Sequence, residues 1–185
     1  KSSSIHRSFN RVVVIHQTNQ ALVEDVVGYD HVGHGFFLES GTEIRNTFRH
    51  NLGILTRLPT AAEQLTPHDS VPSPNRGLIL LPATFWIVNP DNDLEGNAAA
   101  GSEGSGFWMT AQTAPILPAL PVGVPPYRRP MGKFNDNRAH SNSFSNFSID
   151  GQVHKSTQEF TNGHYRPEIS PGQQSIPIIN RFTGF

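Results

Sequence analysis

The sequence contains no cysteine, which excludes disulfide bonds and thiolate metal sites but does not decide the cellular compartment. It also lacks any apolar run that approaches the roughly 18 residues needed by a membrane-spanning helix. The formal net charge is only -1, so the chain has no positive field to attract nucleic acid or an anionic membrane. We therefore expect no nucleic-acid binding and no membrane contact within this segment.

Turn-forming residues, by contrast, are abundant. The 185 residues include 16 glycines and 15 prolines, and only 16% of the residues are charged. This composition is poor in helix formers and rich in residues that end strands and form turns. It favours an all-β fold with many loops.

An internal repeat organises the chain. Residues 23–38, VEDVVGYDHVGHGFFL, return without a gap as residues 94–109, LEGNAAAGSEGSGFWM. A weaker third copy begins at Phe134, and residues 48–51, FRHN, repeat only the opening step. The first two copies align at one constant offset, which pairs Val23 with Leu94, Glu24 with Glu95, Gly33 with Gly104, Gly35 with Gly106 and Phe36 with Phe107. Self-similarity of this kind is typical of a solenoid.

The strand-like pieces within each repeat are too short to bury their apolar faces alone. Stacked in parallel, coil on coil, they bury those faces and satisfy their backbone groups. We therefore predict a parallel β-helix with long loop insertions at about residues 58–82, 111–131 and 151–175. Residues 1–185 are expected to form a single segment of this solenoid. We also expect a fragment of a longer chain, because neither end resembles a capping repeat.

An asparagine recurs after the first strand of several coils, as Asn51, Asn97 and Asn137. Asparagine suits sharp turns because it tolerates the left-handed conformation and bonds its own backbone. It also stacks into a ladder with the asparagine of the next coil. These structural roles are favoured over contact with a ligand.

Three stretches resemble a known family. They are YDHVGHGFFLESGTEIRNTFRHNLGIL, ATFWIVNPDNDLEGNAAAGSEGSGFW and MGKFNDNRAHSN, and they resemble the β-helix region of the family of the cell-migration-inducing and hyaluronan-binding protein and transmembrane protein 2. The same region is similar to parts of fibrocystin-like receptors. The resemblance implies a right-handed parallel β-helix, an extracellular or cell-surface location, and binding and depolymerisation of hyaluronan. It does not imply that this segment holds the catalytic centre.

Candidates for chemistry surround the first copy of the repeat. Glycan cleavage uses one group to protonate the leaving oxygen and another to take a proton from water or from a sugar carbon. His34 and Glu39 are the catalytic candidates; the alternative is that both lie at coil turns and bond backbone groups. An anionic glycan would also need arginines to bind its carboxylates. The candidate ligand-binding residues of these types are His31, Glu43, Arg45, His50, Arg138 and His140.

Aromatic side chains are the second class of ligand-binding candidates. Within a strand, neighbours point to opposite faces, so one member of each aromatic pair should face the core. We expect Phe36, Phe85 and Phe107 to form core stacks. Phe37, Trp86 and Trp108 are then the candidates for outward-facing sugar platforms. For each of them the favoured alternative is packing in the core. A one-residue slip in register would exchange the two sets.

Metal and modification sites are weakly indicated. Residues 89–93, NPDND, form an oxygen-rich turn that resembles half of a calcium loop, but the sequence is also that of an ordinary turn. No pair of histidines has the spacing of a metalloprotease site. We expect no metal and no other cofactor, with calcium as the alternative. Asn146 begins the sequon Asn-Phe-Ser, a glycosylation site in a secreted protein.

The leading prediction is an extracellular β-helix segment that presents a binding surface to hyaluronan or another acidic polysaccharide. Whether the intact protein cuts that polysaccharide is left open. The alternative is a structural or adhesive cell-surface β-helix without catalytic activity.

Overall fold

A computed structural model describes most of the chain. The described residues are 1–38, 40–60, 62–63, 81–114, 123–149, 151–153, 160–161, 163 and 165–185. The catalytic candidate Glu39 lies outside them, as do large parts of the three predicted insertions. Within the described residues no helix is long and apolar enough to cross a membrane.

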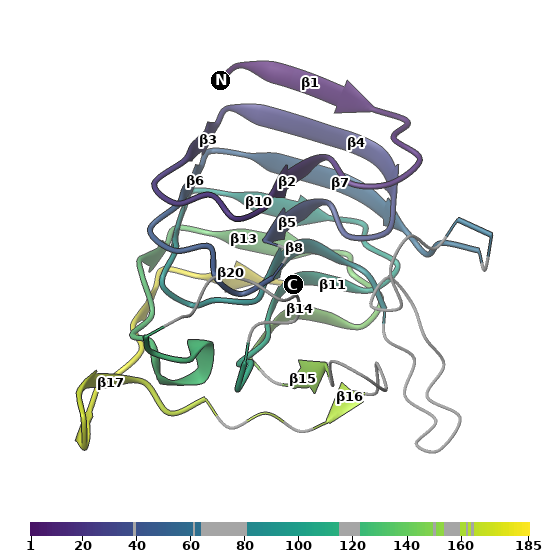
Figure 1. The fold of residues 1–185 in the computed structure, drawn as a ribbon. Coiled ribbons are helices and arrows are strands. Elements are labelled where there is room, and N and C mark those ends of the chain that lie inside the picture. The colour runs from purple at the N-terminus through teal and green to yellow at the C-terminus, as the bar shows by residue number, and fades with distance from the viewer. Residues whose placement is uncertain are drawn as a thin grey trace.

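Three parallel sheets form the solenoid, and the chain passes through them in turn (Figure 1). Sheet A contains β1 (Ser3–His6), β4 (Val26–Val32), β7 (Leu52–Arg57), β10 (Ala98–Ala100), β13 (Arg138–His140) and β20 (Thr183–Gly184). Sheet B contains β2 (Val13–Ile15), β5 (Phe36–Leu38), β8 (Ala83–Ile87), β11 (Ser105–Met109) and β14 (Ser145–Ile149). Sheet C contains β3 (Leu22–Glu24), β6 (Thr47–Arg49), β9 (Asp93–Glu95), β12 (Phe134–Asn135) and β19 (Ile179–Asn180).

Smaller elements lie beside the coils. β15 (Gln152–Val153) pairs antiparallel with β16 (Phe160–Thr161), and β17 (Glu168–Ser170) pairs antiparallel with β18 (Gln173–Gln174). A single 3₁₀ turn, η1, spans Pro126–Arg128. The predicted all-β parallel β-helix is therefore confirmed.

The register of the sheets follows the sequence repeat. Val23 pairs with Phe48, Phe48 with Leu94, and Leu94 with Phe134 in sheet C. The copies at residues 23–38 and 94–109 thus lie two coils apart, with the coil of β6, β7 and β8 between them. Identical positions stack because each coil repeats the same path.

The core is filled unequally by the three sheets. Sheet B sends in a stack of phenylalanines, with Phe36 and Phe85 ring centroids 4.5 Å apart and Phe85 and Phe107 centroids 4.6 Å apart. Sheet A supplies small side chains at most of its central inward row, namely Gly28, Gly53, Ala99 and Ala139, with Ile5 of β1 at one end of the row. Large rings from one wall therefore fill the space that the small residues of another leave.

An asparagine ladder closes the corner between sheets C and A. The side-chain oxygen of Asn97 accepts hydrogen bonds from the backbone and side-chain nitrogens of Asn51, both at 3.0 Å. Asn137 accepts the same pair of bonds from Asn97. The predicted ladder is confirmed, and all three asparagines are buried.

The left-handed part of the asparagine prediction is wrong. The residue before each asparagine takes the left-handed conformation instead, and these residues are His50, Gly96 and Asp136, with φ between 53° and 67°. The asparagines remain in the strand path, where their side chains can point inward to the backbone groups of the adjacent coil.

Candidate functional site

His31 faces the interior, because β4 changes its alternation at Asp30. Asp30 has φ 56°, and Leu55 at the corresponding position of the next coil also has φ 56°. A left-handed residue acts as a bulge, so the side chain that follows it turns inward. His31 is fully buried, and its Nε2 lies 2.9 Å from the Thr56 hydroxyl. That hydroxyl in turn lies 2.7 Å from the hydroxyl of Thr84.

Burial lowers the pKa of His31 from 6.5 to about 4. The unfolded chain therefore binds a proton that the folded chain does not, over the range between these two values. Stability contributed by neutral His31 is present above pH 6.5 and is lost as the pH falls toward 4. We expect about 2 kcal/mol of unfolding free energy to be lost between pH 7 and pH 5.

Urea denaturation at each pH measures this loss. His31→Gln should show a flatter dependence of unfolding free energy on pH, whatever its absolute stability. The exposed His50→Gln is the matched control and should keep the wild-type slope. An unchanged slope in His31→Gln would contradict the assignment.

His34 is also buried and has a structural environment. Its Nδ1 accepts a hydrogen bond of 2.9 Å from the backbone nitrogen of Ala83, in the neighbouring coil. Its ring lies 4.3 Å from the Trp86 ring and 5.6 Å from the Phe37 ring, measured between centroids. A general acid or base must reach the substrate. The burial of His34 therefore favours the alternative of a backbone-bonding coil residue.

Glu43 organises a turn between sheets B and C. Its fully buried carboxylate accepts backbone hydrogen bonds from Gln17, Ser40 and Gly41, at 3.0, 3.2 and 2.8 Å. The Ser40 hydroxyl donates a further bond. Three backbone donors and a hydroxyl satisfy the carboxylate, so Glu43 holds the turn and does not face solvent.

The aromatic residues of sheet B point to the two faces of the sheet as predicted, but none of them is exposed to solvent. Phe36, Phe85 and Phe107 belong to the core, as expected. The side chains of Phe37, Trp86 and Trp108 form a second apolar cluster, yet only 2%, 1% and 5% of their surface is exposed. This burial favours the packing alternative over open sugar platforms, because other parts of the chain cover this cluster. The guanidinium of Arg11, for example, lies 4.0 Å from the centre of the Phe37 ring.

The oxygen-rich turn at residues 89–93 is used within the fold. The Asn89 amide donates to the carbonyl of Gly41, and Asn92 accepts from Asn46 in a second ladder. Arg129 lies 3.1 Å from the Asp91 carboxylate. Among the residues that the structure describes, no group of three or more His, Asp or Glu side chains is placed to hold a metal ion.

Asn146 of the sequon is half-buried in β14. Its side-chain oxygen accepts a 2.9 Å hydrogen bond from Asn142, and its side-chain nitrogen lies near Gly184. A glycan at this position would require the side chain to leave these neighbours.

The remaining ligand-binding candidates are at least partly open to solvent. Arg45 and His50 lie at two different corners of the same coil, both with positive φ. Arg138 and His140 lie together on β13 and face outward from sheet A. The structure thus brings Arg138 and His140 onto one face and separates them from Arg45.

Sequence reasoning missed Tyr29, which lies on this same outer face with 45% of its surface exposed. Tyr29 pairs with His6 on one side and Ile54 on the other, and the row continues through Ala100 to His140. The neighbouring outward row contains Val27, Leu52, Ala98 and Arg138. The alternation in VVGYDHV, once aligned with its repeats, carries the signal for both rows.

Sequence comparison identifies relatives. The family model described as CEMIP beta-helix matches residues 1–147. The chain is similar to the cell migration-inducing and hyaluronan-binding protein of Homo sapiens, with 41% identity over 96% of this chain and 14% of that protein. It is similar to cell surface hyaluronidase CEMIP2 of Homo sapiens, with 41% identity over 81% of this chain and 12% of that protein. Fibrocystin-L of Mus musculus is 36% identical over 76% of this chain and 3% of its own length. The chain therefore spans only a small part of each relative.

Proposed function

Because the chain belongs to the CEMIP β-helix family, we propose that it presents a binding surface to an acidic polysaccharide such as hyaluronan, at the cell surface or outside the cell. Relatives named for hyaluronan binding and as hyaluronidases support the polysaccharide class. The outer face of sheet A is the surface that we assign to this role.

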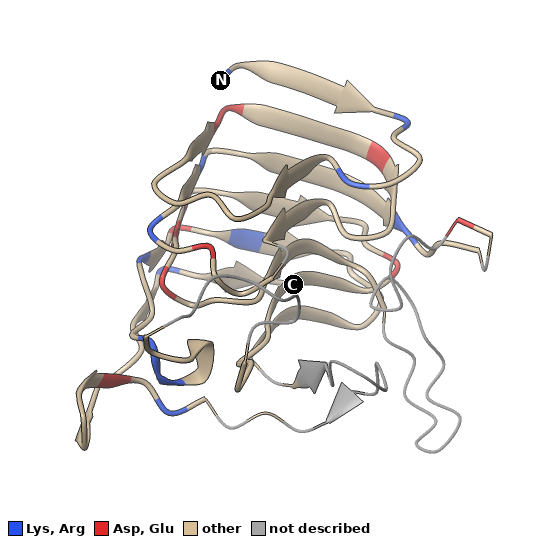
Figure 2. Ribbon diagram, in the orientation of Figure 1, with Lys and Arg blue, Asp and Glu red and all other residues tan. Residues whose placement is uncertain are grey.

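The observation that carries the proposal is the set of side chains on that face. In the ribbon of Figure 2, charged residues lie mostly near strand ends and in turns. Tyr29 offers an exposed ring, and Arg138 an exposed guanidinium. Sugar rings stack on aromatic faces, and guanidinium binds carboxylate in a bidentate manner. An acidic glycan needs both kinds of contact.

The spacing along the solenoid suits a polymer. Tyr29 and His140 occupy one outward row and are three strand spacings apart, about 14 Å. Between them lie the side chains of Ile54 and Ala100. A glycan that runs along the solenoid axis can therefore contact Tyr29 and His140 through different sugar units, with Arg138 in the adjacent row.

Cleavage is not part of the role that we assign to the described residues. His31, His34 and Glu43 are buried and bonded within the coils, where they support the fold. This placement also favours the second candidate function, a structural or adhesive β-helix without catalytic activity. The similarity to fibrocystin-L is consistent with that alternative.

Binding of size-defined hyaluronan oligosaccharides to the 185-residue chain separates these functions. Tyr29→Ala and Arg138→Ala should each weaken binding about tenfold, as expected for the loss of one ring or charged contact. Isothermal titration calorimetry gives the affinities.

Two variants control for general surface effects. Leu22→Ala removes an exposed apolar side chain from sheet C, and Arg166→Ala removes an exposed arginine outside the sheets. Both should bind like the wild type. Equal affinities for all four variants, or no binding to any acidic glycan, would instead favour the structural β-helix.

A further inference from the structure

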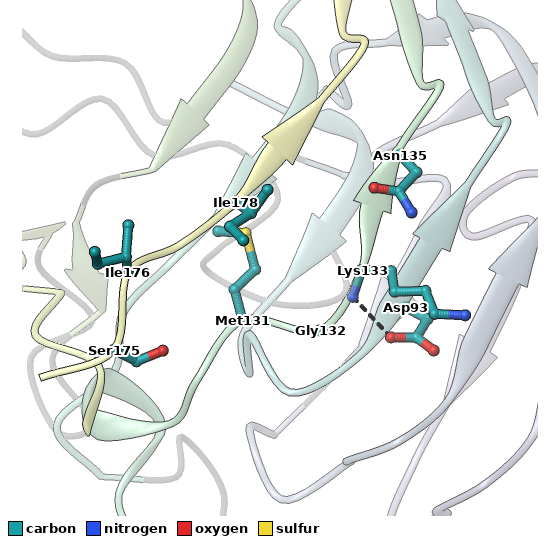
Figure 3. Close-up of a pocket in the computed structure, with 8 residues that line it drawn as sticks. All are labelled: Asp93, Met131, Gly132, Lys133, Asn135, Ser175, Ile176 and Ile178. Atoms are coloured by element: carbon teal, nitrogen blue, oxygen red, sulfur yellow. Dashed lines mark hydrogen bonds between the residues drawn. The ribbon is translucent and has the colours of Figure 1, made fainter. Parts of the chain in front are cut away.

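A hollow of about 470 Å³ lies on the outer side of sheet C (Figure 3). Its walls come from β9, from the chain that enters β12, and from the segment before β19. The hollow falls within the size range of small-ligand sites. Of the candidate residues named from the sequence, only Asp93, the last residue of the oxygen-rich turn, lines the hollow. The full lining consists of Asp93, Met131, Gly132, Lys133, Asn135, Ser175, Ile176 and Ile178.

The polar side chains of the hollow have hydrogen-bonding capacity that the fold does not use. One oxygen of the Asp93 carboxylate accepts a 2.8 Å hydrogen bond from the backbone nitrogen of Lys133, which fixes its direction. Within the described part of the chain, the side chains of Asn135 and Ser175 make no hydrogen bond. The Lys133 ammonium is 3.5 Å from Glu95 and largely exposed. A ligand in the hollow would therefore meet a carboxylate, an amide, a hydroxyl and an ammonium.

The opposite side of the hollow is apolar. Met131 packs against the core and is partly buried. Ile176 and Ile178 stand 83% and 69% exposed beside it. Exposed isoleucines next to a methionine provide a surface for a small apolar group, such as a methyl.

The pairing of β12 disfavours an extended peptide that would add to this strand. Strand addition needs a free edge. β12 is paired with β9 on one side and with β19 on the other, so its own edges are occupied. Recognition at β12 therefore uses side chains. Asn and Asp side chains suit hydroxyl groups, which both donate and accept hydrogen bonds.

These features lead us to propose that the hollow binds the N-acetylhexosamine unit of the glycan, with the acetamido methyl against Met131 and Ile178. Sugar hydroxyls bond Asp93 and Asn135, and Lys133 attracts the carboxylate of a neighbouring uronate. This inference rests on the proposed function. Asn135 and Arg138 lie on the same coil, on either side of the corner at Asp136. One glycan can thus contact sheet A and also reach the hollow.

The two methionines give a direct test. In the methyl-labelled 185-residue chain, a hyaluronan tetrasaccharide should shift the NMR signal of Met131. The signal of Met109, which is fully buried, should not move. The de-N-acetylated tetrasaccharide should not shift the NMR signal of Met131. Asn135→Ala and Ser175→Ala should each raise the midpoint of the Met131 titration about tenfold, whereas Asn180→Ala, one coil further along, should not.

Calorimetry on the same samples separates the two proposals. Suppose that the tetrasaccharide binds and that Tyr29→Ala weakens its binding, but that the NMR signal of Met131 does not shift. The hollow is then not a glycan site, and the sheet A proposal stands. An equal Met131 shift from the de-N-acetylated tetrasaccharide would also overturn the inference. If the tetrasaccharide does not bind at all, both proposals fail.

Discussion

Asn97→Ala should lower the free energy of unfolding by about 3 kcal/mol, because it removes the central member of a buried ladder. Asn97 receives two hydrogen bonds from Asn51 and donates to Asn137 and to the carbonyl of Phe48. Alanine leaves the buried backbone nitrogen of Asn51 without an acceptor. Unsatisfied buried donors cost more than the bond itself contributes.

The matched control for this change is Asn135→Ala, in the adjacent coil. Asn135 is half-buried on the outer face of sheet C and makes no side-chain hydrogen bond within the described residues. Its thermal and urea unfolding should match the wild type within about 0.5 kcal/mol. Equal losses in the two variants would contradict the ladder as a source of stability.

Gly53→Ala should lower the free energy of unfolding by a similar amount, about 3 kcal/mol, because it overpacks the core. A Cβ at this position would lie 2.1 Å from the Cγ2 methyl of Thr84, a separation that requires a shift of the backbone or of Thr84. Thr84 cannot move freely, since its hydroxyl bonds Thr56. Gly123→Ala, where a Cβ would meet no atom within 4 Å, is the control and should be close to neutral.

A second substitution tests the cause of this loss. Thr84→Ser removes the Cγ2 methyl and keeps the hydroxyl that bonds Thr56. In the Gly53→Ala background it should recover most of the lost stability, which gives a positive coupling in a double-mutant cycle. Additive losses would show that the steric account of Gly53 is mistaken.

Much of the fold could be predicted because, in a solenoid, residues that stack on one another occupy equivalent positions in the sequence repeat. The alignment of residues 23–38 with residues 94–109 gives the stacking of Val23 over Leu94 two coils away. The same repeat predicts the phenylalanine stack of Phe36 and Phe107 through Phe85. Strand register is kept from one coil to the next, so one correct offset places many residues.

The placement of the polar candidates could not be predicted in the same way. Strict alternation along β4 puts His31 on the outside, since Tyr29 faces outward. The left-handed Asp30 shifts this alternation and turns His31 inward. Nothing in the local sequence marks Asp30, because an aspartate tolerates both conformations. Single left-handed residues at corners therefore decide which side chains reach solvent.

The exposure of the aromatic residues depends on segments far away in the sequence. Trp86 and Trp108 have the expected orientation relative to Phe85 and Phe107, but their surfaces are covered. Strand parity assigns a face and does not say what lies above that face. Tyr29, on sheet A, has the exposure that we first expected of the tryptophans.

The most direct test of the account is a map of glycan contacts on the 185-residue chain. In amide NMR spectra, a hyaluronan oligosaccharide should perturb β4, β7, β10 and β13, with the largest changes near Tyr29 and Arg138. The turn held by Glu43 and the surroundings of His34 should stay unchanged. Perturbation centred on that turn and on His34, with sheet A unaffected, would contradict two assignments. It would show that the outer face of sheet A is not the binding surface, and that Glu43 and His34 do more than support the fold.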